Sequence, residues 1–190
     1  MRVSEIFYLL LIAAVAASRL FELRLAERHR RALVARGGIE AGAALYPWMV
    51  TLHALFLVAA PLEVVGLRRP FRPLLAAIML AILAGAVALR VAAIRALGER
   101  WTTRVLVVPG LEPVVAGPYR RMRHPNYVAV ALEFAALPLV HGAWLTAAVF
   151  SAANALVLWA RIRAEERALA ALSPYAAAFA ATPRFVPGGR

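Results

Sequence analysis

One short basic segment carries more groups suited to binding a charged small molecule than any other part of the sequence. It reads Gly117-Pro118-Tyr119-Arg120-Arg121-Met122-Arg123-His124-Pro125-Asn126-Tyr127. Gly-Pro favours a turn, and Pro125 suits the first position of a helix because proline has no backbone N–H to leave unpaired. Such a helix start offers free N–H groups and the positive end of its dipole to an anion. With the forked guanidinium of Arg123 beside it, the segment is predicted to bind an anionic or zwitterionic cofactor, although arginines that flank a span usually only set its orientation.

A pair of adjacent carboxylates, Glu165-Glu166, is the candidate for the other half of this site. Arg161 lies four residues before Glu165, and Arg163 lies three residues before Glu166, so both glutamates can form ion pairs within one helix. Such pairs on a solvated helix stabilise it by roughly 0.2–0.5 kcal/mol each, and this structural role alone can account for the two glutamates. The functional interpretation is that one carboxylate faces the basic segment. A helical hairpin would allow this, because it returns both of its ends to the same side.

Two ionisable residues, His53 and Glu63, lie within an apolar run. Charged or titratable side chains are costly inside a membrane and often functional. His53 is therefore a candidate for contact with a substrate and for a general base, although a lone histidine in a helix is commonly just hydrogen-bonded to a neighbour. Glu63 has the alternative of lying at the outer interface. Arg19 and Glu22 interrupt an earlier run and could pair with each other without any catalytic role.

These residues are set among long apolar regions, which define the fold class. The chain has 190 residues, of which 63% are hydrophobic, and a mean hydropathy of +0.73. A soluble domain is roughly 45–50% apolar, and one of this size has too little interior to hide the excess. We therefore predict an all-α integral membrane protein that forms a single domain, residues 1–190.

About five transmembrane helices are expected, since each needs about 20 apolar residues. The predicted spans cover residues 3–25, 46–67, 73–97, 127–139 and 143–162. The last two form a helical hairpin, because the apolar region 127–162 is too long for one span and contains Pro138, His141 and Gly142 near its middle. The first run also fits a signal peptide, but it continues through Leu20 and Phe21, which favours a retained span.

All 22 basic residues are arginine, and they set the expected orientation. Most of them lie in the first connection, in the long third connection and in the tail after the last span. Because cytoplasmic loops carry the excess of basic residues, we expect the N-terminus outside a bacterial inner membrane and the C-terminus and cofactor pocket in the cytoplasm. The net charge of +12 is then expected to favour contact with anionic lipid headgroups rather than with nucleic acid. There is no cysteine and no ligand-spaced pair of histidines, so no metal site is expected.

The basic segment and the glutamate pair together resemble a known signature. Arg123-His124-Pro125-Asn126-Tyr127, then 37 residues, then Glu165-Glu166, is similar to the R-H-P-x-Y … E-E pattern of the isoprenylcysteine carboxyl methyltransferase family. Further elements that resemble that family, in the same order, are Arg95-x-Leu97-Gly98-x-x-Trp101, Gly117-Pro118-Tyr119, Leu169, Tyr175 and Arg184-Phe185-Val186-Pro187. The resemblance covers residues 95–187, which is the expected catalytic region.

The resemblance implies a methyltransferase that uses S-adenosylmethionine at the cytoplasmic face. It implies a cofactor pocket lined by Tyr119, Arg123, His124, Pro125, Tyr127, Glu165 and Glu166. The candidates for catalytic residues are Arg123, Glu166 and His53. Ala129 departs from the family, which often has glycine at that position, so the helix is expected to pack slightly differently there.

The N-terminal half resembles a narrower group, the bacterial members that O-methylate long-chain alkylpyrones or alkylresorcinols. The resemblance rests on Glu40, Gly42, Tyr46-Pro47, Met49-Val50, Leu52-His53 and Leu62-Glu63. It implies a lipophilic acceptor that enters from the bilayer, favouring a phenolic lipid made by a type III polyketide synthase, and otherwise a prenylcysteine-like carboxylate. Two alternatives stay open: an NADPH-dependent membrane reductase similar to sterol reductases, and a non-catalytic membrane scaffold.

Overall fold

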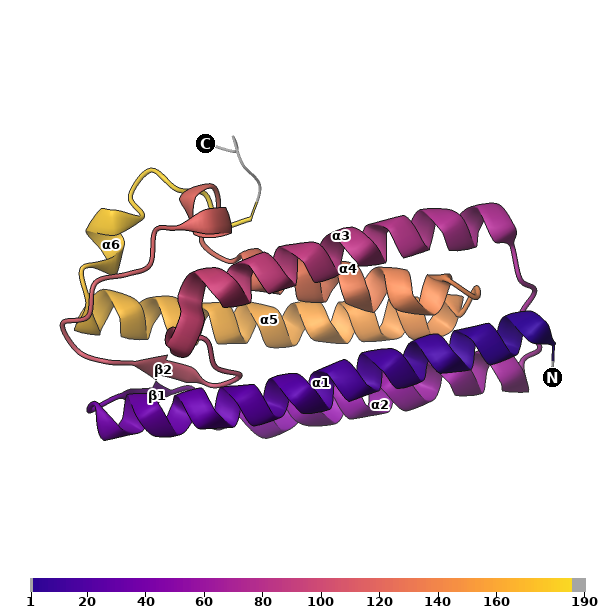
Figure 1. Cartoon of the computed structure of the whole chain (residues 1–190), viewed down its shortest axis with the longest axis horizontal. Helices are drawn as coiled ribbons and strands as arrows, with labels where there is room; N and C mark the ends of the chain where they lie inside the picture. The colour runs from indigo at the N-terminus through magenta and orange to yellow at the C-terminus, as the bar shows by residue number, and fades with distance from the viewer. Residues whose placement is uncertain (1, 186–190) are drawn as a thin grey trace.

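The computed structural model describes residues 2–185, and it is almost entirely helical. Its elements in chain order are α1 (Val3–Ala35), β1 (Ile39–Ala41), α2 (Leu45–Gly66), α3 (Pro73–Leu97), η1 (Gly98–Arg100), β2 (Val105–Val107), η2 (Gly117–Arg120), α4 (Pro125–Leu139), α5 (Trp144–Leu172) and α6 (Tyr175–Ala178) (Figure 1). Val186 and Pro187, which contribute to the family resemblance, lie outside the described residues.

Four of these helices are long and apolar enough to cross a membrane: Val3–Ala35, Leu45–Gly66, Pro73–Arg100 and Trp144–Leu172. The fifth expected span corresponds to α4, which has 15 residues. A straight helix of that length extends about 22 Å, less than the roughly 30 Å of a bilayer core. The prediction of an all-α integral membrane protein is confirmed, with the difference that α4 is a short apolar helix rather than a full span.

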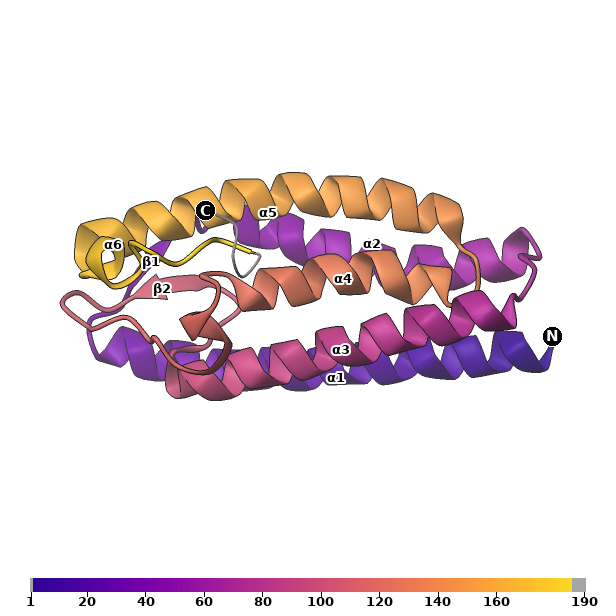
Figure 2. The ribbon, with the colours of Figure 1, turned by 90° about the horizontal axis from the view of Figure 1, so that it is seen from above.

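The five principal helices run side by side along the long axis of the molecule (Figures 1 and 2). Helix α3 packs along α4, α4 along α5, α5 along α2, and α2 along α1. Large buried side chains of their shared core include Tyr8, Phe56, Leu83, Phe134 and Leu137. The predicted hairpin is therefore present as the antiparallel pair α4 and α5, with α3 on one side and α2 on the other.

The turn between α4 and α5 is fixed by Glu63 of α2. Its carboxylate accepts hydrogen bonds from the backbone N–H groups of Leu145 (3.2 Å) and Thr146 (2.6 Å) and pairs with Arg69 at 2.7 Å. Two of the four unpaired N–H groups at the start of α5 are thereby satisfied by a side chain from another helix. Glu63 thus stabilises the end of the bundle that carries the N-terminus, far from the basic segment (Figure 1).

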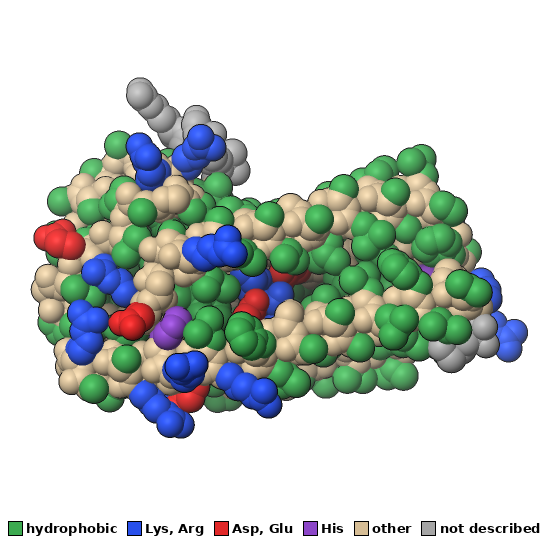
Figure 3. All heavy atoms as spheres, in the orientation of Figure 1, with side chains coloured by type: hydrophobic (Ala, Val, Ile, Leu, Met, Phe, Trp, Pro, Cys, Tyr) green, Lys and Arg blue, Asp and Glu red, His purple; other side chains and the backbone are tan. Residues whose placement is uncertain are grey.

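The opposite end of the bundle is covered by the loops that carry the candidate site. Strands β1 and β2 pair antiparallel there, with Glu40 opposite Leu106. Glu40 also accepts a hydrogen bond from Arg104 at 2.6 Å, which links the first connection to the third. Figure 3 shows that basic side chains gather toward this end on the visible face, while the long helices are covered mainly by hydrophobic side chains. We call it the site end of the bundle.

Candidate cofactor and acceptor site

The basic segment forms a turn, a short helix and the start of α4, in the order its sequence predicts. Gly117 begins η2 with a φ of +54°, and a Cβ there would lie 3.2 Å from the Cβ of Ala96 on α3. Both facts favour glycine, because L-residues rarely adopt that conformation and the helix is close. Pro125 occupies the first turn of α4 directly after His124, as expected. The site end of α4 is therefore held against α3.

Glu166 lies against the basic segment, as the functional interpretation of the glutamate pair requires. The Nε2–H of His124 donates to Glu166 at 3.0 Å. Arg184 from the chain after α6 donates to both carboxylate oxygens, with its Nε at 3.0 Å and its Nη2 at 2.7 Å. Backbone bonds from Arg123 to Pro183 (2.9 Å) and from His124 to Arg184 (3.1 Å) lay the same stretch of chain over the start of α4. Residues from the two ends of the hairpin and from the tail thus form one unit.

Glu165 contacts a second part of the same segment. It accepts a hydrogen bond from the hydroxyl of Tyr127, and that hydroxyl in turn accepts one from the Nε of Arg161 at 2.9 Å. Arg161 also donates to the backbone carbonyl of Thr103 at 2.5 Å. Arg163 lies over the ring of Trp159, with its guanidinium carbon 4.1 Å from the ring centre. Neither arginine forms the ion pair with the glutamates that sequence spacing allows: Arg161 contacts other elements, and Arg163 stacks on a neighbour in its own helix.

Arg123 and Tyr119 complete a set of polar residues at the site end. We call this set, which also contains His124, Tyr127 and Glu165, the polar wall. The Nε of Arg123 donates to the backbone carbonyl of Thr182 at 2.6 Å, which fixes the direction of its guanidinium. Tyr119 is buried and packs with Ala93, Tyr175 and Phe179. Burial raises the pKa of the Tyr119 hydroxyl, and the negative charge of a nearby glutamate adds to the effect. Tyr119 therefore remains a neutral hydrogen-bond donor over the physiological pH range.

A cavity of about 470 Å³ joins this wall to the membrane part of the bundle. Five of the seven residues predicted to bind the cofactor border it: Tyr119, Arg123, His124, Tyr127 and Glu165. The other two, Pro125 and Glu166, lie just outside the lining, because Pro125 is buried at the helix start and Glu166 is turned toward His124 and Arg184. The cavity volume lies within the usual range for small-molecule sites, roughly 300–1,000 Å³.

Two buried polar atoms on the cavity wall suit a ligand with hydrogen-bonding groups. The indole Nε1 of Trp101 and the side-chain oxygen of Asn126 have no hydrogen-bond partner among residues 2–185, and both residues border the cavity. Buried polar groups in proteins almost always have partners. S-adenosylmethionine carries an amino group, a carboxylate, ribose hydroxyls and an adenine ring, so it offers both a donor and an acceptor for these atoms. The residues present fit that cofactor.

His53 borders the same cavity from α2. Its Nδ1 lies 2.8 Å from the carbonyl oxygen of Met49, which can only accept, so Nδ1 carries the proton. In the neutral ring, Nε2 is then left with a free lone pair. The ring stands edge-on to Phe134, with 4.8 Å between ring centres. Both alternatives for His53 are thus combined: it is hydrogen-bonded within its own helix, and it faces a cavity.

Sequence reasoning missed an ion cluster on the wall of the cavity, in which Arg90 and Glu133 are buried and Arg19 and Glu22 are partly buried. Arg19 pairs with Glu22 at 2.5 Å, as anticipated, and also with Glu133 of α4 at 3.0 Å. Arg90 of α3 donates hydrogen bonds to both carboxylate oxygens of Glu133, one of them from its Nε at 3.1 Å. Its Nη1 also lies 3.4 Å from the Glu22 carboxylate. The signal was available, because Arg90 and Glu133 are charged residues within apolar helices. We call these four residues the Arg–Glu cluster.

Comparisons with known proteins agree with the motif. The profile of the isoprenylcysteine carboxyl methyltransferase family matches residues 77–171, which contain α4, most of α5 and the cavity wall between them. An uncharacterised protein of Bacillus subtilis, YpbQ, is 39% identical over 160 residues, which is 84% of this chain and 95% of that protein. An uncharacterised protein of Haemophilus influenzae is 31% identical over 170 residues, covering 89% of this chain and 98% of that protein. No solved structure matches the chain. The chain therefore belongs to the isoprenylcysteine carboxyl methyltransferase family, whose members are membrane methyltransferases that use S-adenosylmethionine.

Proposed function

We propose that this protein transfers a methyl group from S-adenosylmethionine to an oxygen of a lipophilic acceptor that enters from the bilayer. The observation that carries the proposal is that one cavity is bordered both by polar residues at the site end and by His53 in the membrane part of α2. A water-soluble cofactor and a membrane-borne acceptor need such a meeting point. We place the site end at the cytoplasmic face, because most of the arginines lie in the first connection, the third connection and the tail, and basic side chains gather at this end on the face that Figure 3 shows.

The polar wall is proposed to bind and orient the cofactor. When bound, S-adenosylmethionine supplies an electrophilic methyl group on a sulfonium. Arg123 offers its guanidinium to the cofactor carboxylate. Glu165, fixed by Tyr127, offers an oxygen to the cofactor's hydroxyl or amino groups. Glu166 does not border the cavity, so we assign it as a positioning residue that holds His124 in place.

His53 is proposed to accept the proton from the acceptor hydroxyl. A phenol has a pKa near 10, as tyrosine does, so its oxygen benefits from a nearby base during methylation. The free lone pair on His53 Nε2 faces the cavity and suits this role. A carboxylate acceptor is already ionised and needs no base. Of the two phenolic lipids, this difference favours a long-chain alkylresorcinol, because the more acidic enol of a long-chain alkylpyrone needs the base less. Both remain preferred to a prenylcysteine-like carboxylate, and either implies a functional link to a type III polyketide synthase.

Calorimetry with S-adenosylhomocysteine tests the cofactor part of the proposal. The purified protein is expected to bind it, and Arg123→Ala is expected to weaken binding about tenfold or more, the loss typical of one hydrogen bond to a charged group. Arg121→Ala is the matched control, because Arg121 is an exposed arginine two residues away that does not border the cavity. Titration with NADPH in the same buffer gives the contrast: binding of NADPH but not S-adenosylhomocysteine would support a reductase, and binding of neither would support a scaffold.

A further inference from the structure

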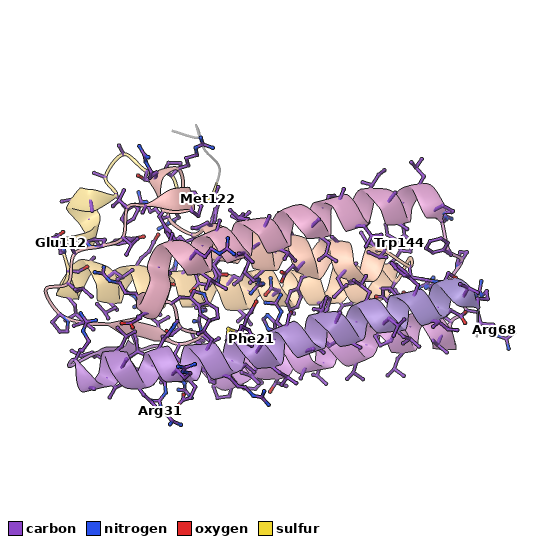
Figure 4. The ribbon with its side chains drawn as sticks, viewed as in Figure 1. Phe21, Arg31, Arg68, Glu112, Met122 and Trp144 are labelled. Carbon is purple, nitrogen blue, oxygen red and sulfur yellow. The ribbon has the colours of Figure 1, made fainter. Side chains whose placement is uncertain are left out.

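The Arg–Glu cluster joins helices that otherwise leave a hollow between them. Helix α1 packs mainly against α2 and η1, while Arg19 and Glu22 reach from it across to Arg90 on α3 and Glu133 on α4. Figure 3 shows this hollow between α3 and α1, with acidic and basic side chains visible at its bottom. Figure 4 shows Phe21 about midway along α1, between the site end near Arg31 and the opposite end near Arg68. The cluster therefore lies at the depth of the apolar part of the bundle.

The cluster faces open space on two sides. Arg19, Glu22 and Arg90 border the main cavity. Arg19 and Glu133 also border a second, smaller pocket of about 40 Å³, whose other walls are mostly apolar side chains such as Phe56, Leu83 and Leu137. These charged groups therefore border space that a ligand can enter, and they can form hydrogen bonds with its polar head.

The cluster has no net charge, and this limits what it can bind. Two guanidinium groups are matched by two carboxylates, each already in contact with a partner of opposite sign. A carboxylate that enters the low-dielectric region beside them finds no surplus positive charge within the cluster to offset the loss of its hydration, which costs several kcal/mol or more by order of magnitude. Other arginines of the cavity lining, such as Arg123 and Arg161, belong to the polar residues of the site end. A neutral hydroxyl loses far less hydration on entry. It can donate to the Glu22 carboxylate and accept from Arg19 or Arg90 without disturbing the charge balance.

We infer that the Arg–Glu cluster is the head-group site for the acceptor, and that it selects a lipid with an uncharged, hydroxyl-bearing head over one with an anionic head. The inference rests on the proposed methyl transfer and adds the residues that determine its specificity. His53 borders both the main cavity and the smaller pocket beside the cluster. A head group held by the cluster therefore lies next to the proposed base, and the apolar tail of the lipid extends through the hollow between α1 and α3.

Competition between two acceptors of matched tail tests the inference. The full-length protein in lipid vesicles receives S-adenosylmethionine with equal amounts of 3-pentadecylphenol and hexadecanoate, and mass spectrometry gives the ratio of methyl ether to methyl ester. The wild type is expected to form mainly the ether. Glu22→Gln leaves the cluster with one surplus positive charge and is expected to shift the ratio toward the ester by about tenfold, the size of one charge-assisted contact. Arg19→Gln leaves one surplus negative charge and is expected to shift the ratio the other way.

Opposite shifts from two variants in one cluster distinguish selection by charge from loss of structure, which would move both ratios in the same direction. Glu27→Gln is the control, because Glu27 is on the same helix and pairs with Arg30 and Arg31 outside the cavity. A wild-type preference for the ester, or equal ratios in all four proteins, would overturn the inference while leaving methyl transfer intact. Failure of the wild type to bind S-adenosylhomocysteine or to methylate either lipid would instead overturn the proposed function.

Discussion

Replacement of Glu166 by glutamine tests whether the chain after α6 and the start of α4 form one cofactor-binding unit. Glu166 accepts hydrogen bonds from two partners that differ greatly in exposure. The side chain of His124 is 3% exposed, whereas that of Arg184 is 56% exposed. Glutamine keeps the size of the side chain but loses its charge and one of its two acceptor oxygens. The two contacts should therefore be weakened to different extents.

The expected magnitude follows from this difference in burial. An exposed ion pair such as Arg184–Glu166 contributes roughly 0.2–1 kcal/mol after screening by solvent. A buried hydrogen bond to a charged group, such as that from His124, contributes roughly 1.5–3 kcal/mol. Because His124 borders the cavity, loss of its orientation should act directly on the cofactor. We expect Glu166→Gln to raise the Kd for S-adenosylhomocysteine about 10- to 30-fold, and Arg184→Gln to raise it less than about fivefold.

Isothermal titration calorimetry of the two variants and the wild type in one detergent provides the measurement. Glu112→Gln serves as the control, because Glu112 is an exposed glutamate of the third connection and does not border the cavity. Its Kd should equal that of the wild type. The reasoning is refuted if Arg184→Gln weakens binding as much as Glu166→Gln, because the exposed contact would then matter as much as the buried one.

Three further substitutions probe other parts of the account. His53→Gln should lower the rate with a phenolic acceptor about 10²- to 10⁴-fold, the usual contribution of a general base, with little change in the Kd for S-adenosylhomocysteine; an unchanged rate would exclude His53 as the base. Tyr127→Phe removes the hydroxyl between Arg161 and Glu165 and should destabilise the protein by about 1–3 kcal/mol in thermal unfolding, because it leaves partly buried charges unsatisfied; an unchanged Tm would contradict this. Gly117→Ala should cost about 1–2 kcal/mol, because it places a side chain in a left-handed conformation against α3, and Gly110→Ala, also at positive φ but with open space around it, separates the effect of conformation from that of contact.

The sequence was most informative where a property is local. Apolar length predicted α1, α2, α3 and α5, and Pro125 predicted the start of α4. The hairpin interpretation was enough to bring the glutamate pair to the basic segment, because the two ends of an antiparallel pair meet by geometry alone.

Contacts between distant elements could not be predicted in the same way. The spacing of Arg161 and Glu165 permits an ion pair within the helix. Instead, the hydroxyl of Tyr127 accepts a hydrogen bond from Arg161 and donates one to Glu165. Arg90 is 43 positions from its partner Glu133, so only the packing of α3 on α4 brings them together. The length of α4 was limited by the turn at Gly142, which places the start of α5 within reach of the Glu63 carboxylate.

Transfer of a labelled methyl group to a lipid is the most direct test of the central claim. The purified protein in vesicles that contain a bacterial lipid extract is incubated with S-adenosylmethionine labelled with carbon-13 in its methyl group, and the lipids are then analysed by mass spectrometry and NMR. The account predicts that the label appears on an oxygen of an apolar lipid and is lost in Arg123→Ala but not in Arg121→Ala. Label found only on nitrogen or carbon, or no labelled lipid from any extract, would contradict it.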